Sequence, residues 1–287
     1  MDEHILSFFD KLEKVDPRII YMLLFVVVAF PLLRPLGLPM SMSPMTVSVY
    51  DVVDKIKPGD VVVVSIDYSA ASQPEQYPQT KAVIAHLSAK GAKIVMLGFW
   101  VDGIPFADRA LNDVFGGSKG HPKYGIDFVN LGWIPNGEVG MAALGKDVQA
   151  TCPRDYYGNP TEAIPMMRDI KSGRDFKLVM TISSGTPGYA EWVRQIQAQY
   201  GTVLITGVTA VSAPAARAYF PAQLSGILEG LAGAAEYEVL LVKYGYKGTL
   251  AAPMDAQSLT HLLVIIFIVL GNIGFVLRKY GKVKQIR

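Results

Sequence analysis

The sequence predicts an α/β protein: a doubly wound, mostly parallel, Rossmann-like sheet in one extracytoplasmic domain, flanked by two transmembrane helices. At least five runs rich in β-branched residues alternate with helical patterns and loops between residues 60 and 208. This alternation is typical of parallel strands joined by right-handed crossovers. Two apolar runs, Ile19–Leu33 and Leu259–Leu277, lie outside this region. The second contains no Asp, Glu, Lys or Arg, and at about 1.5 Å per residue it just reaches across a hydrocarbon core of about 30 Å.

The charges beside the apolar runs predict the topology. Residues 278–287 form a dense basic tail, and Lys11, Lys14 and Arg18 flank the first run. Positive residues close to a membrane helix stay in the cytoplasm, so both termini are expected inside a plasma (inner) membrane, with the main domain outside. The predicted order is an amphipathic cytoplasmic helix (1–18), a first transmembrane helix (19–35), a connector (36–58), the α/β domain (59–246), a second connector (247–258), a second transmembrane helix (259–277) and the basic tail (278–287).

The composition excludes several classes of protein and site. The formal net charge is only +2, and its basic excess is local, so membrane lipid is an expected partner and nucleic acid is not. Cys152 is the single cysteine, so no intrachain disulfide can form. The histidines are scattered without the spacing of a zinc site. The sequence therefore predicts no metal and no cofactor.

Each strand of the predicted sheet is a short apolar run. Residues 60–66 read DVVVVSI, a pattern typical of a strand buried on both faces of a parallel sheet. Stretches richer in Gly, Pro and charge, 116–124 and 150–174, are expected to be loops. One domain is favoured over two lobes divided near Ala150, because the second lobe would own only two clear strands. The predicted strands are Asp60–Ile66, Ala92–Phe99, Ile126–Leu131, Phe176–Ile182 and Thr202–Val208, and the predicted helices between them are Pro78–Lys90, Ala107–Phe115, Val139–Lys146 and Gly188–Tyr200.

The segment Pro221–Tyr244 is expected to be one long helix, with proline in its first turn. Its apolar residues recur at helical spacing. A second row contains only small residues, Gly226, Gly230 and Ala234. Glycine inside a helix costs about 0.5–1 kcal/mol relative to alanine, so the row indicates close approach of another backbone. That backbone belongs either to the sheet of the same domain or to a neighbouring subunit.

The last apolar run carries one strongly polar group near its middle. Asn272 lies beside Gly271 and close to Gly274. An amide inside a membrane helix hydrogen-bonds readily to another helix, and small residues allow that helix to approach. These three residues are therefore predicted to form a second oligomer interface.

Four loops follow the predicted strands at the edge of the sheet where open parallel sheets bind ligands. They carry acids, hydroxyls and glycine. Such residues also cap helices and form turns, so capping is the competing interpretation. Convergence of one residue from each loop on a single pocket is the condition for ligand binding or catalysis, the four being Asp67, Asp102, Ser184 and Thr209. The candidate ligand-binding residues are Asp67, Ser69, Ser72, Asp102, Ser183, Ser184, Gly185, Thr186, Thr209 and Ser212.

Three functions compete. The leading hypothesis is a structural or scaffold protein that self-assembles through its α/β domain and membrane helices, with homo-oligomers and a further membrane protein as partners. The alternative is a sensor or receptor for a small molecule or anion that passes a signal through the second membrane helix. A membrane-bound hydrolase ranks third, because none of the common catalytic motifs appears and no catalytic residue is assigned.

Overall fold

The computed structural model describes residues 16–285, and the chain divides into two compact units. Residues 40–248 form the α/β unit, whereas residues 16–39 and 249–285 form a helical unit. Most of the amphipathic helix predicted over residues 1–18 lies outside the described residues.

The α/β unit contains a six-stranded sheet with the order β3-β2-β1-β4-β5-β6, and every neighbouring pair is parallel. The central strand β1 pairs through Val62 with Ile94 on one side and with Leu178 on the other. The strand order reverses direction between β1 and β4, which makes that boundary the topological switch point. The strands are β1 (Val61–Asp67), β2 (Lys93–Gly98), β3 (Phe128–Trp133), β4 (Leu178–Ser183), β5 (Val203–Val208) and β6 (Ile227–Glu229).

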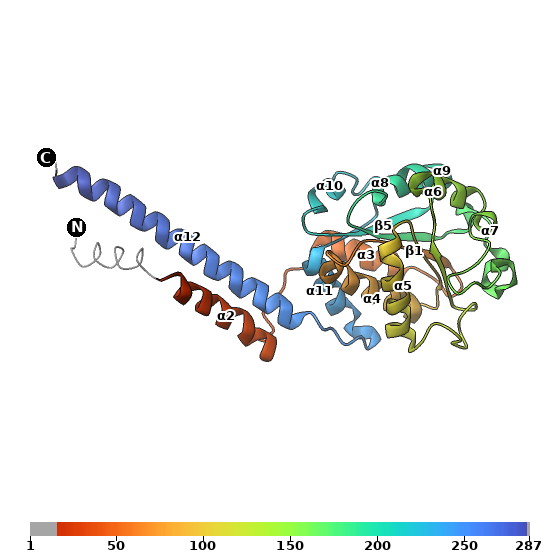
Figure 1. Cartoon of the computed structure of the whole chain (residues 1–287), viewed down its shortest axis with the longest axis horizontal. Coiled ribbons are helices and arrows are strands. Elements are labelled where there is room, and N and C mark those ends of the chain that lie inside the picture. Colours follow the sequence, from red (N-terminus) through yellow and green to blue (C-terminus); the bar gives the residue numbers. More distant parts are fainter. Residues whose placement is uncertain (1–15, 286–287) are drawn as a thin grey trace. The chain divides into compact units, whose positions relative to one another are not determined.

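Helices cover both faces of the sheet, as Figure 1 shows. Successive side chains of β1 point to opposite faces. Val62 and Val64 therefore join a core with α3, α4, α5 and α11, whereas Val63 joins a core with α6, α7, α8 and α10. The helices are α3 (Pro44–Asp54), α4 (Gln73–Ala89), α5 (Ile104–Phe115), α6 (Gly137–Lys146), α7 (Val148–Thr151), α8 (Tyr189–Trp192), α9 (Ala198–Tyr200), α10 (Ala213–Arg217) and α11 (Gly230–Leu240), with a π-helical turn (Val193–Gln197) joining α8 to α9.

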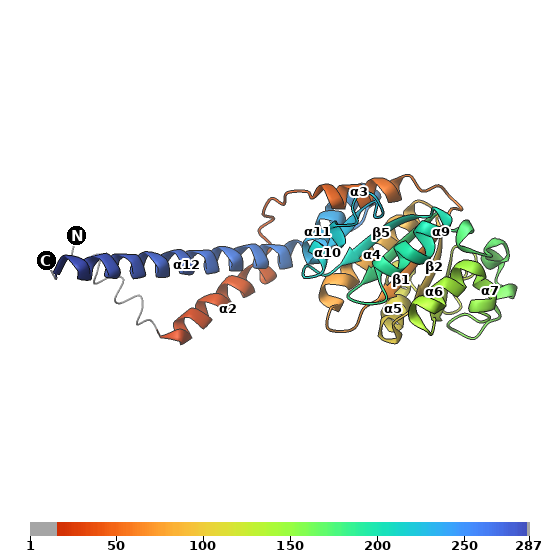
Figure 2. The same cartoon turned by 90° about the horizontal axis from the view of Figure 1, so that it is seen from above.

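Helix α3 replaces part of the connector predicted over residues 36–58. The Ser43 hydroxyl accepts a hydrogen bond from the Met45 amide, and Pro44 occupies the first turn of the helix. Proline is compatible with that position because its missing N–H has no intrahelical partner there. Val49 and Val53 are fully buried, and α3 lies beside α11 when seen from above (Figure 2). The part of the connector before it, residues 36–43, is not helical, and α3 begins only at Pro44.

The prediction of one long helix over Pro221–Tyr244 is wrong. The segment contains a turn, the edge strand β6, helix α11 and a final 3-10 turn, Leu241–Tyr244. Gly230 has φ +58°, a left-handed conformation that favours glycine and separates β6 from α11. Gly226 precedes β6 and packs against Val49 of α3. The close backbone contact inferred from Gly226 therefore exists, but it lies within the unit, and the predicted row of small residues is not a helix face.

The helical unit consists of α2 (Pro17–Leu33) and α12 (Ala251–Gln285), which pack against one another. By length and composition, the part of α12 over Ala251–Leu277 is the one described helix that could cross a membrane. Helix α2 is apolar but shorter, so two spans stay a prediction. Helix α12 begins inside the connector predicted over 247–258, and its buried Asp255 accepts hydrogen bonds from the chain that follows α2. The donors are the amides of Leu36 (2.7 Å), Gly37 (2.9 Å) and Leu38 (2.9 Å).

Candidate functional site

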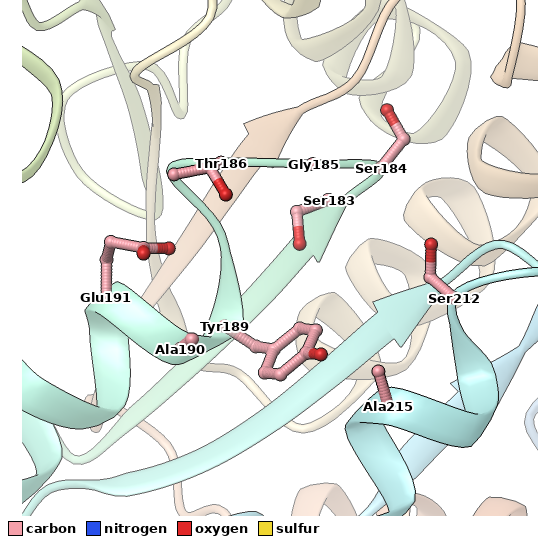
Figure 3. A pocket seen from close by; sticks show the side chains of 9 residues that line it. All are labelled: Ser183, Ser184, Gly185, Thr186, Tyr189, Ala190, Glu191, Ser212 and Ala215. Atoms are coloured by element: carbon pink, nitrogen blue, oxygen red, sulfur yellow. The ribbon is translucent and has the colours of Figure 1, made fainter.

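A cavity of about 190 Å³ lies at the carboxyl ends of β4 and β5. Two loops form it, one between β4 and α8 and the other between β5 and α10, as Figure 3 shows. Its position beside the switch point agrees with the general rule for ligand sites in open α/β sheets. The residues that line it are Ser183, Ser184, Gly185, Thr186, Tyr189, Ala190, Glu191, Ser212 and Ala215.

Ser183 is the last residue of β4 and lies at the floor of this pocket. Its side chain is only 2 % exposed, and its Oγ has no hydrogen-bond partner among the residues that the structure describes. Figure 3 shows the hydroxyl pointing into the space between Thr186, Tyr189 and Ser212, whereas the Ser184 side chain points away. Leaving a buried hydroxyl unpaired costs about 1–3 kcal/mol. A ligand in the pocket would supply the missing partner.

The opposite wall contains a second hydroxyl, that of Ser212, which can still donate a hydrogen bond. Thr209 Oγ1 donates to Ser212 Oγ at 3.0 Å and accepts from the Ser212 amide at 3.3 Å. Since Ser212 accepts from Thr209, its own hydroxyl proton is available to donate. Ser183 and Ser212 can therefore each donate and accept toward a bound molecule.

Glu191 is buried in the pocket wall, and both of its carboxylate oxygens are engaged. One accepts from the Gly188 amide at 2.7 Å and the other from the Arg194 guanidinium at 2.7 Å. Arg194 also binds Glu138 through two contacts of 2.9 and 3.0 Å. The amide at the start of α8 is thus already capped, and the charge of Glu191 is compensated by a neighbouring cation.

Asp67 lies behind the pocket, fully buried at the end of β1. Its side chain accepts from the Phe99 amide (2.6 Å), the Trp100 amide (3.2 Å) and the Ser65 hydroxyl (2.5 Å), so it fastens β1 to the loop after β2. Burial raises the pKa of Asp67 to about 7, against the opposing effect of these three donors.

Trp100, whose amide donates to Asp67, also contacts the β4–α8 loop of the pocket. A Cβ added at Gly185 would lie 2.9 Å from an atom of the Trp100 ring, so the ring packs directly against the loop. Glycine is needed at this position because any side chain would displace Trp100.

The structure brings together only part of the predicted set. Ser183, Ser184, Gly185, Thr186 and Ser212 line one pocket, whereas Asp67, Ser69, Ser72, Asp102 and Thr209 do not. Asp102 is exposed on a 3-10 turn, so it forms no acid pair with the enclosed Asp67. The four residues chosen as the test of convergence therefore do not meet as a set. By that condition the four-loop site is dropped for ligand binding and for catalysis, and the pocket at β4 and β5 is a different arrangement, built by two neighbouring loops alone.

The capping interpretation is also only partly correct. Ser72 and Ser212 occupy the N-cap positions of α4 and α10, yet neither side chain makes a capping hydrogen bond. Glu191 instead accepts a hydrogen bond from the amide of Gly188, the N-cap residue of α8. The sequence interpretation missed Glu191 and Tyr189. A glutamate three residues after a helix-initiating Gly188 was the available signal, because a glutamate at that spacing can accept from the N-cap amide.

The predicted oligomer residues fall into two groups. Ala234 is fully buried within the α/β unit, and Gly226 and Gly230 pack against Val49 and Ala210 of the same unit. On α12, Gly271 has no atom within 4 Å of where a Cβ would lie, Asn272 is exposed and Gly274 is buried. Of the six, only Gly271 and Asn272 therefore lie on an open surface of the described residues.

Cys152 is buried, and burial raises the pKa of its thiol to about 12, so the thiol stays protonated and is a poor nucleophile.

No protein-family model matches the chain, and neither does any curated protein or solved structure. The fold and the pocket define the protein as a chain with a parallel α/β unit and an apolar helix, and with a small cavity, partly lined by hydroxyls, at the carboxyl ends of β4 and β5.

Proposed function

We propose that this chain is a membrane-anchored binding protein or receptor, whose α/β unit holds a small polar molecule between the β4–α8 and β5–α10 loops. The buried, unpartnered hydroxyl of Ser183 is the observation that carries this proposal. Catalysis is not part of the proposal, because the cavity is lined by hydroxyls and by one carboxylate whose two oxygens are already bonded.

Contacts between α10, β6 and α11 could pass a movement from the pocket along the chain. Helix α10 supplies Ala215 to the pocket wall, and its Arg217 binds Glu229 of β6 through two contacts of 2.7 and 2.6 Å. Glu229 directly precedes α11, and α12 follows α11 in the chain. A shift of α10 on binding would thus reach the start of α11. Because little of the chain is predicted to lie in the cytoplasm, a receptor of this kind needs a membrane partner protein to receive the signal.

A pocket-filling substitution tests this function. We expect small molecules that raise the unfolding temperature of the full-length wild-type chain in a zwitterionic detergent to have no effect on Ala215→Leu, because the leucine occupies the cavity. A ligand present at 100 times its Kd stabilises the folded state by about 2.7 kcal/mol, which a thermal-shift screen detects. The screen should contain monosaccharides, amino acids, amines, carboxylates and phosphates.

Ala218→Leu is the matched control, because Ala218 is exposed at the end of α10 and does not line the pocket. It should retain every shift seen for the wild type. The proposal is wrong if no compound in the screen stabilises the wild type, or if the stabilising compounds act equally on Ala215→Leu.

A second candidate function, self-association as a scaffold, is favoured by the exposed amide of Asn272 on apolar α12. We expect Asn272→Leu to lower the oligomer size of the chain in mild detergent without reducing its membrane insertion, because a hydrogen bond between membrane helices contributes about 1–2 kcal/mol in model peptides. Native mass spectrometry measures the size. An unchanged distribution of oligomers would remove the role of Asn272 in packing.

A further inference from the structure

We propose that the pocket selects a small, neutral, polyhydroxylated molecule of about monosaccharide size; this inference rests on the binding function proposed above. Four features of the pocket carry it: its volume, its hydroxyl lining, its charge and its single aromatic wall.

The volume limits the size of the ligand. A cavity of about 190 Å³ is smaller than the range of about 300–1,000 Å³ that is usual for drug-sized ligands. A dinucleotide would also require a glycine-rich turn after the first strand. Residues 68–72, which join β1 to α4, read YSAAS and contain no glycine. The pocket is therefore suited to a compact molecule.

The polar groups that face the cavity are mainly hydroxyls. Ser183 has no hydrogen-bond partner within residues 16–285, Ser212 has a hydroxyl that can still donate, and Thr186 points inward from the loop above them (Figure 3). A hydroxyl can donate one hydrogen bond and accept two. Several such groups around one cavity match a ligand whose own groups also donate and accept, as the hydroxyls of a polyol do.

The charge of the lining disfavours ions of either sign. No lysine or arginine lines the cavity, the carboxylate of Glu191 faces it, and the Gly188 amide donates to Glu191. An anion would therefore meet a carboxylate and no cationic side chain. A cation would find only Glu191, whose charge Arg194 already compensates at 2.7 Å. A neutral ligand meets neither the repulsion that Glu191 exerts on an anion nor the lack of an uncompensated carboxylate that a cation would need.

Tyr189 provides the remaining wall. Its ring is partly exposed and lies beside the cavity, on the side of Ala215 (Figure 3). An aromatic ring offers an apolar face together with a polar hydroxyl at its end. Such a wall suits a molecule with C–H groups on one face and hydroxyls around its rim.

The test is calorimetric titration of the full-length chain in phosphatidylcholine nanodiscs, free of sugar-based detergent. The neutral probes are D-glucose, D-galactose, D-ribose and myo-inositol, and the charged probes are inorganic phosphate and putrescine. We expect at least one neutral probe to bind, and Ser183→Ala to weaken that binding by about 3- to 10-fold, the effect of one hydrogen bond. Ser183→Ala should not reduce the unfolding midpoint, because it removes a polar atom that has no partner.

Ser88→Ala is the control, because Ser88 lies near the end of α4 and is not among the lining residues. It should bind the neutral probe as the wild type does. Phosphate that binds wild type and Ser183→Ala equally would occupy another place, such as the groove lined by Lys55, Lys57 and Lys177, and would support the neutral class for this pocket.

Two results would overturn the inference. If no neutral probe binds, or if Ser183→Ala leaves neutral binding unchanged, the ligand class is wrong. If phosphate or putrescine binds instead and loses affinity in Ser183→Ala, the class is wrong while the binding function stands. Loss of the binding function itself would appear separately, as the absence of any thermal shift that Ala215→Leu abolishes.

Discussion

In the variant Asp67→Asn, the free energy of unfolding of the α/β unit is expected to rise with pH between about 4 and 6.5. In the wild type it is expected to change little over this interval. Burial raises the pKa of Asp67 from 3.8 to about 7 in the folded state. Between these values the folded chain holds a proton that the unfolded chain has released. The contribution of Asp67 to stability is therefore fully present below pH 3.8 and is lost as the pH rises through 7, with a slope of up to about 1.4 kcal/mol per pH unit.

His86 acts in the opposite direction over almost the same interval. Its Nδ1 lies 2.8 Å from the Tyr237 hydroxyl, its ring stacks on Tyr50, and burial lowers its pKa from 6.5 to about 4. Between pH 4 and 6.5 the unfolded chain binds the proton more readily, so stability rises with pH by a similar slope. The two titrations largely cancel in the wild type, and removing Asp67 leaves the rise due to His86.

Urea unfolding at several pH values checks this expectation. The tryptophans, Trp100, Trp133 and Trp192, all lie in the α/β unit, so fluorescence reports on that unit in the full-length chain. Asn at position 67 retains an oxygen that can accept from the Phe99 and Trp100 amides. His86→Gln is the counterpart variant and should show stability that falls as the pH rises. Equal slopes for wild type and Asp67→Asn would show that Asp67 does not titrate in this interval.

Gly226→Ala is expected to destabilise the α/β unit by about 1–3 kcal/mol, the usual cost of inserting a group into a close-packed site. The new Cβ would lie 2.6 Å from the Val49 amide nitrogen and 2.9 Å from its Cα. These are backbone atoms and cannot move without shifting α3. The carbonyl of Gly226 accepts from the Thr206 amide at 3.1 Å, so β5 restrains the other side.

The same variant separates packing within one chain from contact between subunits. Packing within the unit predicts a lower urea midpoint with unchanged oligomer size. An interface between subunits would give the reverse, a changed oligomer size in native mass spectrometry with an unchanged midpoint. Gly271→Ala is the matched control, because no atom lies within 4 Å of its added Cβ, and it should leave the midpoint of the α/β unit unchanged.

Much of the fold follows from local patterns. The predicted strands at 60–66, 92–99, 126–131, 176–182 and 202–208 differ from β1, β2, β3, β4 and β5 by at most two residues at either end. β-Branched runs are reliable signals because such residues are stiff at χ1 and pack well in a buried sheet. The segment 221–244 failed because the apolar spacing of an edge strand followed by a helix resembles that of one long helix. Nothing local showed that Gly230 has a positive φ.

The sequence by itself determined the parallel α/β class, the hydroxyl-bearing loops that follow β4 and β5, and the apolar character of α12. These properties depend on the order and periodicity of residues, which the chain carries locally. The tertiary structure decided which loops share a cavity, that Ser183 lacks a partner while Glu191 has two, and that Gly226 packs inside the unit. Such properties depend on contacts between residues far apart in the chain: the Gly226 carbonyl meets β5, and a Cβ at Gly226 would meet α3. No spacing within one segment encodes them.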